Sequence, residues 1–141
     1  MSILADQSRI VYIASPISTF STPRYDRMVA HVRARFPDHE ILTARGLWES
    51  PESWRQLWPL LHPRLTRIIA FSDEDGRVGA GVVQEILDGN AASIPIEFVT
   101  EDGRFVPLRD ARVRLIPGGD MQNFAQIVLL VLVSNNAEVN S

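Results

Sequence analysis

Short apolar runs alternate with amphipathic segments along the chain up to residue 99. Each run is ended by a turn signal, and runs of this length are typical of buried β-strands. We predict four strands, at residues 9–14, 39–44, 66–72 and 94–99. Strands that alternate with helices indicate a parallel sheet with right-handed crossovers. The expected fold is therefore α/β, a Rossmann-like or flavodoxin-like open, mainly parallel sheet with helices on both faces.

The first two helices between these strands each begin with a capping residue and a proline. One starts at Pro23, and its apolar positions recur at helical spacing until Pro37. The other starts at Pro51, and we expect Pro59 and Pro63 to break or kink it.

The pattern changes after residue 99. Residues 101–104 predict a hairpin turn, and the runs 105–108 and 112–116 predict strands at the edge of the sheet. A closing helix over about 121–133 is apolar around almost its whole circumference. Such a helix must be covered on more than one side, which predicts a homodimer or a larger homo-oligomer with a helix-mediated interface.

Composition narrows the domain organisation and the classes of partner. A length of 141 residues predicts one domain over 1–141, with its ends, 1–8 and 135–141, frayed. Apolar residues make up 45% and charged residues 22% of the chain, which is typical of a globular protein. Cysteine is absent, which excludes disulfides and thiolate chemistry and fits a cytoplasmic protein. The net charge of −3 argues against duplex nucleic acid as a partner. No apolar run approaches the ~20 residues that cross a bilayer, so we expect no membrane partner.

Ligands of open parallel sheets bind beyond the carboxyl ends of the strands, where three loops of this chain are expected to meet. The first loop offers hydroxyl groups, including Ser15 and Ser18, and then Arg24, which suits a sugar or a phosphate. Taken singly, these serines are first of all typical turn and capping residues. In the second loop core packing is the main expectation for Trp48, and stacking on a base is the alternative.

The third loop contains Gly76, Gly79 and Gly81, which permit close backbone approach and positive φ, and it leads into a helix predicted over 81–92. Helical spacing places Glu85 near the start of this helix, on a flank that faces the crevice. The helix N-terminus favours the ionised carboxylate, which is the form a nucleophile needs. A glutamate near a helix start is also common for its dipole interaction alone, so spacing leaves a structural role open.

Two segments together resemble the nucleoside 2-deoxyribosyltransferase-like superfamily. They are Val11-Tyr12-Ile13-Ala14-Ser15-Pro16 and Gly79-Ala80-Gly81-Val82-Val83-Gln84-Glu85-Ile86, the second followed by Ile94-Pro95-Ile96. The resemblance spans about residues 9–99. It implies that Glu85 is the nucleophile on the anomeric carbon of a nucleoside or nucleotide, and that Tyr12 and Ser15 lie at the sugar site. Similar proteins usually carry an Asp before the third strand, where this chain has Leu65-Thr66-Arg67. Asp73 or Asp75, in the loop that follows, is the expected substitute.

The implied activity is cleavage of the N-glycosidic bond of a nucleoside 5′-monophosphate or nucleoside, by hydrolysis or base transfer, without a metal or cofactor. Arg24 favours the phosphorylated substrate. The resemblance also implies an assembly in which a C-terminal segment completes a neighbour's site, with Asp120 and Asn123 as candidates to reach it. Two alternatives remain open: a non-catalytic nucleotide-binding module of the same fold, and an offshoot that cleaves NAD.

Overall fold

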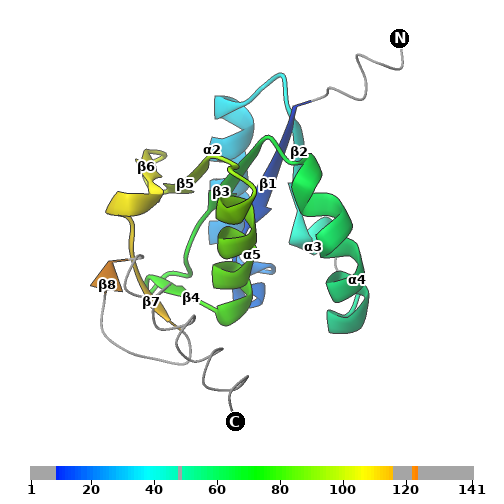
Figure 1. The fold of residues 1–141 in the computed structure, drawn as a ribbon. Helices are drawn as coiled ribbons and strands as arrows, with labels where there is room; N and C mark the ends of the chain where they lie inside the picture. The colour runs from blue at the N-terminus through cyan, green and yellow to red at the C-terminus, as the bar shows by residue number, and fades with distance from the viewer. Residues whose placement is uncertain (1–8, 48, 116–121, 124–141) are drawn as a thin grey trace.

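A mostly parallel sheet of five strands forms the centre of the computed structural model, which describes residues 9–47, 49–115 and 122–123 (Figure 1). The strands are arranged in the order β2-β1-β3-β5-β6. Their bounds are β1 (Ile10–Ala14), β2 (Glu40–Thr43), β3 (Arg67–Ala70), β5 (Ile96–Val99) and β6 (Phe105–Pro107). The first four are mutually parallel, and β6 runs antiparallel to β5 at the edge. The α/β prediction is confirmed at this level.

The helices that begin at Pro23 and Pro51 start where the capping signals place them. The helices are α2 (Pro23–Arg35), α3 (Ala44–Leu47), α4 (Pro51–Leu61) and α5 (Ala80–Ala91), with 3-10 turns η1 (Ile17–Thr19), η2 (His62–Arg64) and η3 (Leu108–Asp110). The Thr22 side chain accepts a hydrogen bond from the backbone of Tyr25, and Ser50 forms a capping box with Ser53. These bonds satisfy donors that the first helical turn leaves unpaired, which is why both starts could be read from the sequence.

The two faces of the sheet carry separate cores. Successive side chains of a strand point to opposite faces, so Val11 and Ile13 of β1 pack with Met28 of α2, whereas Tyr12 packs with Ile86 of α5. The whole of β1 is buried, as expected for a central strand covered on both sides. Figure 1 shows α5 in front of the sheet and α2 behind it.

Pro59, which was expected to break or kink the second helix, does not break it. α4 continues through Pro59 to Leu61, and Pro63 falls in η2 immediately afterwards. Pro59 lies in the last turn of α4 and is exposed, so the helix loses one backbone hydrogen bond near its end and not in its middle. The chain then tightens into a 3-10 turn before β3 begins.

The C-terminal part differs from expectation in its pairing. The hairpin between β5 and β6 is confirmed, with Gly103 at φ 83 in the turn. β7 (Arg112–Leu115), predicted as an edge strand, instead joins a small second sheet between β4 (Arg77–Val78) and β8 (Gln122–Asn123). The edge of the main sheet is already occupied by β6, so β7 pairs with the loop that precedes α5.

The predicted closing helix is contradicted at residues 122–123, which form β8. The rest of that helix lies outside the described residues, as do the ends predicted to fray. In the described part of the chain, no helix is both long enough and apolar enough to cross a membrane.

Candidate functional site

A cavity of about 420 Å³ opens at the carboxyl ends of β1 and β2, beside the start of α5. The loop after β1, the start of α3, the first turns of α4 and the first turns of α5 form its walls. The lining residues are Ser15, Pro16, Ile17, Ser18, Phe20, Ala44, Pro51, Trp54, Arg55, Gly79, Gly81, Val82 and Glu85. Its location agrees with the sequence-based expectation, and its size is within the range of small-molecule sites.

Glu85 and Tyr12 meet at this cavity, although 73 positions separate them in the sequence. The Tyr12 hydroxyl donates a hydrogen bond of 2.7 Å to Oε2 of Glu85. Tyr12 is fully buried on the central strand, and the Glu85 side chain lines the cavity although the residue is only 8% exposed. The structure therefore brings together Glu85, the expected nucleophile, and Tyr12, which the resemblance placed at the sugar site.

The ionisation of Glu85 differs from the prediction. Burial raises the pKa of Glu85 to about 7, against the opposing effect of hydrogen bonds from Tyr12 and Trp54, and the charge of Asp88 raises it further. Glu85 lies in the second turn of α5, which begins at Ala80, and not in the first. The favourable effect of the helix N-terminus fades within one turn, so desolvation dominates. Both forms of the carboxyl group are consequently populated near neutral pH.

The Tyr12 hydroxyl stays protonated over the same range. Burial raises the pKa of Tyr12 well above its ordinary value, and the neighbouring carboxylate of Glu85 raises it further. Tyr12 is therefore a permanent hydrogen-bond donor to Glu85. A neutral donor of this kind stabilises the carboxylate without neutralising it.

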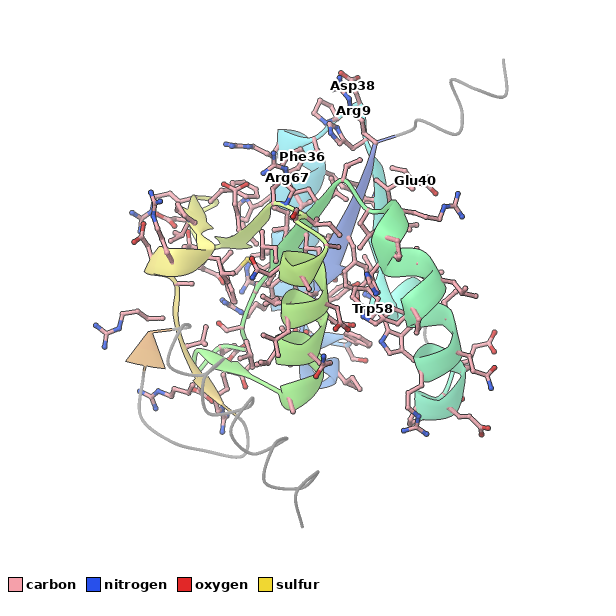
Figure 2. All side chains as sticks on the ribbon, in the orientation of Figure 1. Arg9, Phe36, Asp38, Glu40, Trp58 and Arg67 are labelled. Carbon is pink, nitrogen blue, oxygen red and sulfur yellow. The ribbon has the colours of Figure 1, made fainter. Side chains whose placement is uncertain are left out.

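An aromatic stack holds one wall of the cavity in place. The Tyr12 and Trp54 rings are stacked at 6.0 Å and 26°, and the Trp54 and Trp58 rings at 5.6 Å and 27°. Trp58 points from α4 toward α5 (Figure 2), where its Nε1 donates a 2.9 Å hydrogen bond to Asp88. The sequence indicated only that Trp54 and Trp58 share a helix face. It did not show that Trp54 lines the cavity and hydrogen-bonds Glu85.

Gly79 and Gly81 line the cavity for a reason other than the one expected. Gly79 is the N-cap of α5 with φ −92, and neither of these two glycines adopts positive φ, whereas Gly76, earlier in the same loop, does so at φ 78. A Cβ atom built on either residue would meet no atom within 4 Å. Each glycine therefore leaves open the space that a side chain would take, and Gly79 also leaves the first turn of α5 without a side-chain cap.

Three further polar residues line the cavity besides Glu85. Ser15 and Ser18, both predicted, follow β1, and Arg55 projects from α4. Sequence reasoning missed Arg55. The available signal was its position one residue after Trp54 in the first turns of a helix whose N-terminus faces the crevice.

Arg24 and Asp75 are not among the residues that line this cavity. Nε of Arg24 donates a 3.0 Å hydrogen bond to the carbonyl of Ser72, and its NH1 group pairs with Glu101 beside a second hollow. Asp75 is exposed and pairs with Arg77 within the loop before α5. The expectation that these two residues join Glu85 is therefore not supported by their positions.

Two predicted residues receive no side-chain placement. Trp48 lies outside the described residues. Asn123 lies on β8, where its backbone pairs with that of Arg112 in β7. In the described part of the chain, no three His, Asp or Glu side chains form a group that could hold a metal ion.

Comparison with protein-family models, curated proteins and solved structures finds no match to this chain.

Proposed function

We propose that this protein cleaves the N-glycosidic bond of a nucleoside or nucleotide, with Glu85 as the nucleophile. The observation that carries the proposal is the hydrogen-bonded pair of Tyr12 and Glu85 at an apolar cavity. A buried carboxyl group with a raised pKa, in a cavity of this size, is typical of a reactive site. The resemblance to the nucleoside 2-deoxyribosyltransferase-like superfamily assigns the same role to Glu85.

The reaction follows the logic of retaining glycosidases. Ionised Glu85 attacks the anomeric carbon, a C–O bond forms as the C–N bond breaks, and the electron pair of that bond leaves with the base. The leaving base takes up a proton as it departs. Water then adds to the anomeric carbon, releases the sugar and restores the carboxylate, and a second base in place of water would give transfer.

The residues around Glu85 fit this chemistry. Tyr12 and Trp54 hydrogen-bond the carboxyl group, which orients it and favours its ionised form. The rings of Trp54 and Phe20 contribute apolar walls suited to stacking on a base. Ser15 offers a hydroxyl group to a sugar.

We also propose which class of α/β fold the chain adopts. The strand order and the helices on both faces support a Rossmann-like or flavodoxin-like classification. A cytoplasmic location also belongs to the proposal, because a chain without cysteine suits a reducing compartment.

A nucleotide-binding module without catalysis is the second candidate, and one observation favours it. With a pKa of about 7, much of Glu85 is protonated near neutral pH, and a protonated carboxyl group is a poor nucleophile but a good hydrogen-bond donor. In that case Glu85 would bind a base or a sugar and leave the glycosidic bond intact.

A substrate panel separates these two functions. The purified protein is incubated with nucleosides, nucleoside 5′-monophosphates and NAD, and free base is measured by chromatography. Base or nicotinamide released from any of them supports the enzyme, and the responding compound identifies the substrate. A ligand that raises the melting temperature while no compound loses its base would contradict it and support the binding module.

A further inference from the structure

Arg55 has no partner in the described part of the chain. It forms no hydrogen bond, ion pair or ring contact there, and it is exposed where it lines the Glu85 cavity. The cavity lining contains no other cationic side chain. By contrast, Arg24, which lines the second hollow, forms an ion pair with Glu101. Arg77, in the loop before α5, forms ion pairs with Asp73 and Asp75.

The other polar side chains of the cavity without a hydrogen bond in the described part of the chain come from a different element than Arg55. The side-chain hydroxyls of Ser15 and Ser18 follow β1 and form no hydrogen bond with described residues, whereas Arg55 comes from α4. Every other lining residue except Glu85 is apolar or glycine. Among the described residues that line the cavity, the side chains without a hydrogen-bond or ionic partner thus present a guanidinium group and two hydroxyl groups.

We infer that Arg55 makes this cavity an anion-recognition site, which takes a ligand carrying a phosphomonoester group that Arg55 binds. The inference names the ligand class of the cavity and rests on the proposed function in treating that cavity as the ligand site. The planar guanidinium fork matches phosphate oxygens in a bidentate geometry and stays charged at any physiological pH. An unpaired hydroxyl, such as that of Ser18, is a suitable second donor.

The charges within the cavity set the direction in which such a ligand lies. Glu85 is buried and Arg55 is exposed, so the negative carboxylate is deep and the positive guanidinium is toward solvent. An anionic group is repelled by the first and attracted by the second. The phosphate therefore lies at the mouth of the cavity, and the uncharged part of the ligand lies against Glu85 and Trp54.

Ligand-induced thermal stabilisation tests the inference. The wild-type protein, R55Q and R33Q are heated with AMP, GMP, CMP or UMP, or with the corresponding nucleosides, and free base is measured in the same samples. Arg33 is the matched control, because it is also exposed and without an ion pair but lies on α2, outside the cavity. We expect a monophosphate to bind R55Q about 10- to 100-fold more weakly than it binds the wild type, with nucleoside binding unchanged and R33Q like the wild type.

Two results would overturn the inference. In the first, a monophosphate stabilises R55Q as strongly as it stabilises the wild type. In the second, every monophosphate stabilises the wild type no more than the corresponding nucleoside does. If base is released and R55Q retains its monophosphate affinity, the proposed function stands and the role of Arg55 is wrong. If Arg55-dependent stabilisation occurs without base release from any compound, the anion site stands and the proposed catalysis fails.

Discussion

At the scale of single residues, the burial of ionised Glu85 lowers the stability of the folded protein, and the hydrogen bonds from its neighbours only partly compensate. Its carboxylate must leave water, and the hydrogen bonds from Tyr12 and Trp54 do not return the pKa to its ordinary value. If this position served the stability of the fold alone, a neutral side chain of the same shape, such as glutamine, would give a more stable protein. This cost can be measured as a dependence of stability on pH.

We predict that E85Q is more stable than the wild type at alkaline pH. The folded-state pKa of about 7 exceeds the ordinary value of 4.5, so between these values the folded protein keeps a proton that the unfolded chain has lost. The free energy of unfolding of the wild type therefore falls as the pH rises from 4.5 to about 7, and it stays lower above that range. The full difference is roughly 3 kcal/mol.

Urea unfolding at pH 5 and pH 8 measures this effect. The advantage of E85Q over the wild type should be larger at pH 8 than at pH 5. E74Q is the control, because Glu74 is exposed and forms no ion pair in the described structure, and it should match the wild type at both pH values. An E85Q protein that is equally stabilised or destabilised at both pH values would contradict the raised pKa.

The Tyr12 hydroxyl should control the pH at which Glu85 becomes active. Its hydrogen bond lowers the pKa of Glu85, so its removal in Y12F should raise that pKa further. Activity that needs the carboxylate is lost as the pH falls through the pKa, and in Y12F we expect this loss at a higher pH than in the wild type. The measurement is base release as a function of pH.

Y25F is a matched control for this substitution. The Tyr25 hydroxyl is also buried but has no hydrogen-bond partner among the described residues, and it belongs to the core on the α2 face of the sheet. Its removal should leave the pH profile unchanged. A profile of Y12F that coincides with that of the wild type would refute the role of Tyr12 as the donor that holds Glu85 in its ionised form.

At the scale of elements, two glycines of α5 have opposite surroundings. A Cβ at Gly89 would overlap Cδ1 of Ile68, which is fully buried in the sheet, whereas a Cβ at Gly81 would meet nothing within 4 Å. Close packing of α5 on β3 therefore needs glycine at one position. At the other, glycine keeps the cavity open.

We predict opposite effects of alanine on stability at these two positions. G89A should lower the free energy of unfolding by about 1–3 kcal/mol because Ile68 must move. G81A should raise it by up to about 1 kcal/mol because alanine favours the helix, and it should weaken ligand binding because its methyl group enters the cavity. Chemical unfolding and ligand titration of both variants measure these effects. A destabilised G81A with normal ligand affinity would contradict this view of the cavity.

The elements that sequence reasoning predicted correctly are those specified locally. The starts of α2 and α4 follow from a cap and a proline, and the turn before β6 follows from Gly103. The pairing of β7 with β4 could not be predicted, because β4 has two residues and its partner is far along the chain. The same limit applies to the site: helical spacing indicated Glu85, but the positions of Arg24 and Arg55 depend on tertiary packing.

At the scale of the whole molecule, assembly is a prediction that rests on the sequence. The helix predicted over about 121–133 is contradicted at residues 122–123, which form β8, so the prediction now rests on the apolar residues from 124 to 133, which lie outside the described part of the chain. A helix of such residues needs cover on more than one side. We expect a homodimer with a mass of about twice the 15.8 kDa of one chain. Light scattering at micromolar concentration measures it, and a particle of single-chain mass would contradict the prediction.

The central claim is that a buried carboxylate on α5 performs chemistry on a ligand held in the adjoining cavity. E85Q tests it most directly, since glutamine keeps the shape of the side chain and can still accept the hydrogen bond from Tyr12, but it cannot attack an anomeric carbon. The measurement is the rate of base release by the wild type and by folded E85Q, on the compound that the substrate panel identifies. We predict release by the wild type and none above background by E85Q. Turnover by E85Q within a few-fold of the wild-type rate would contradict the account.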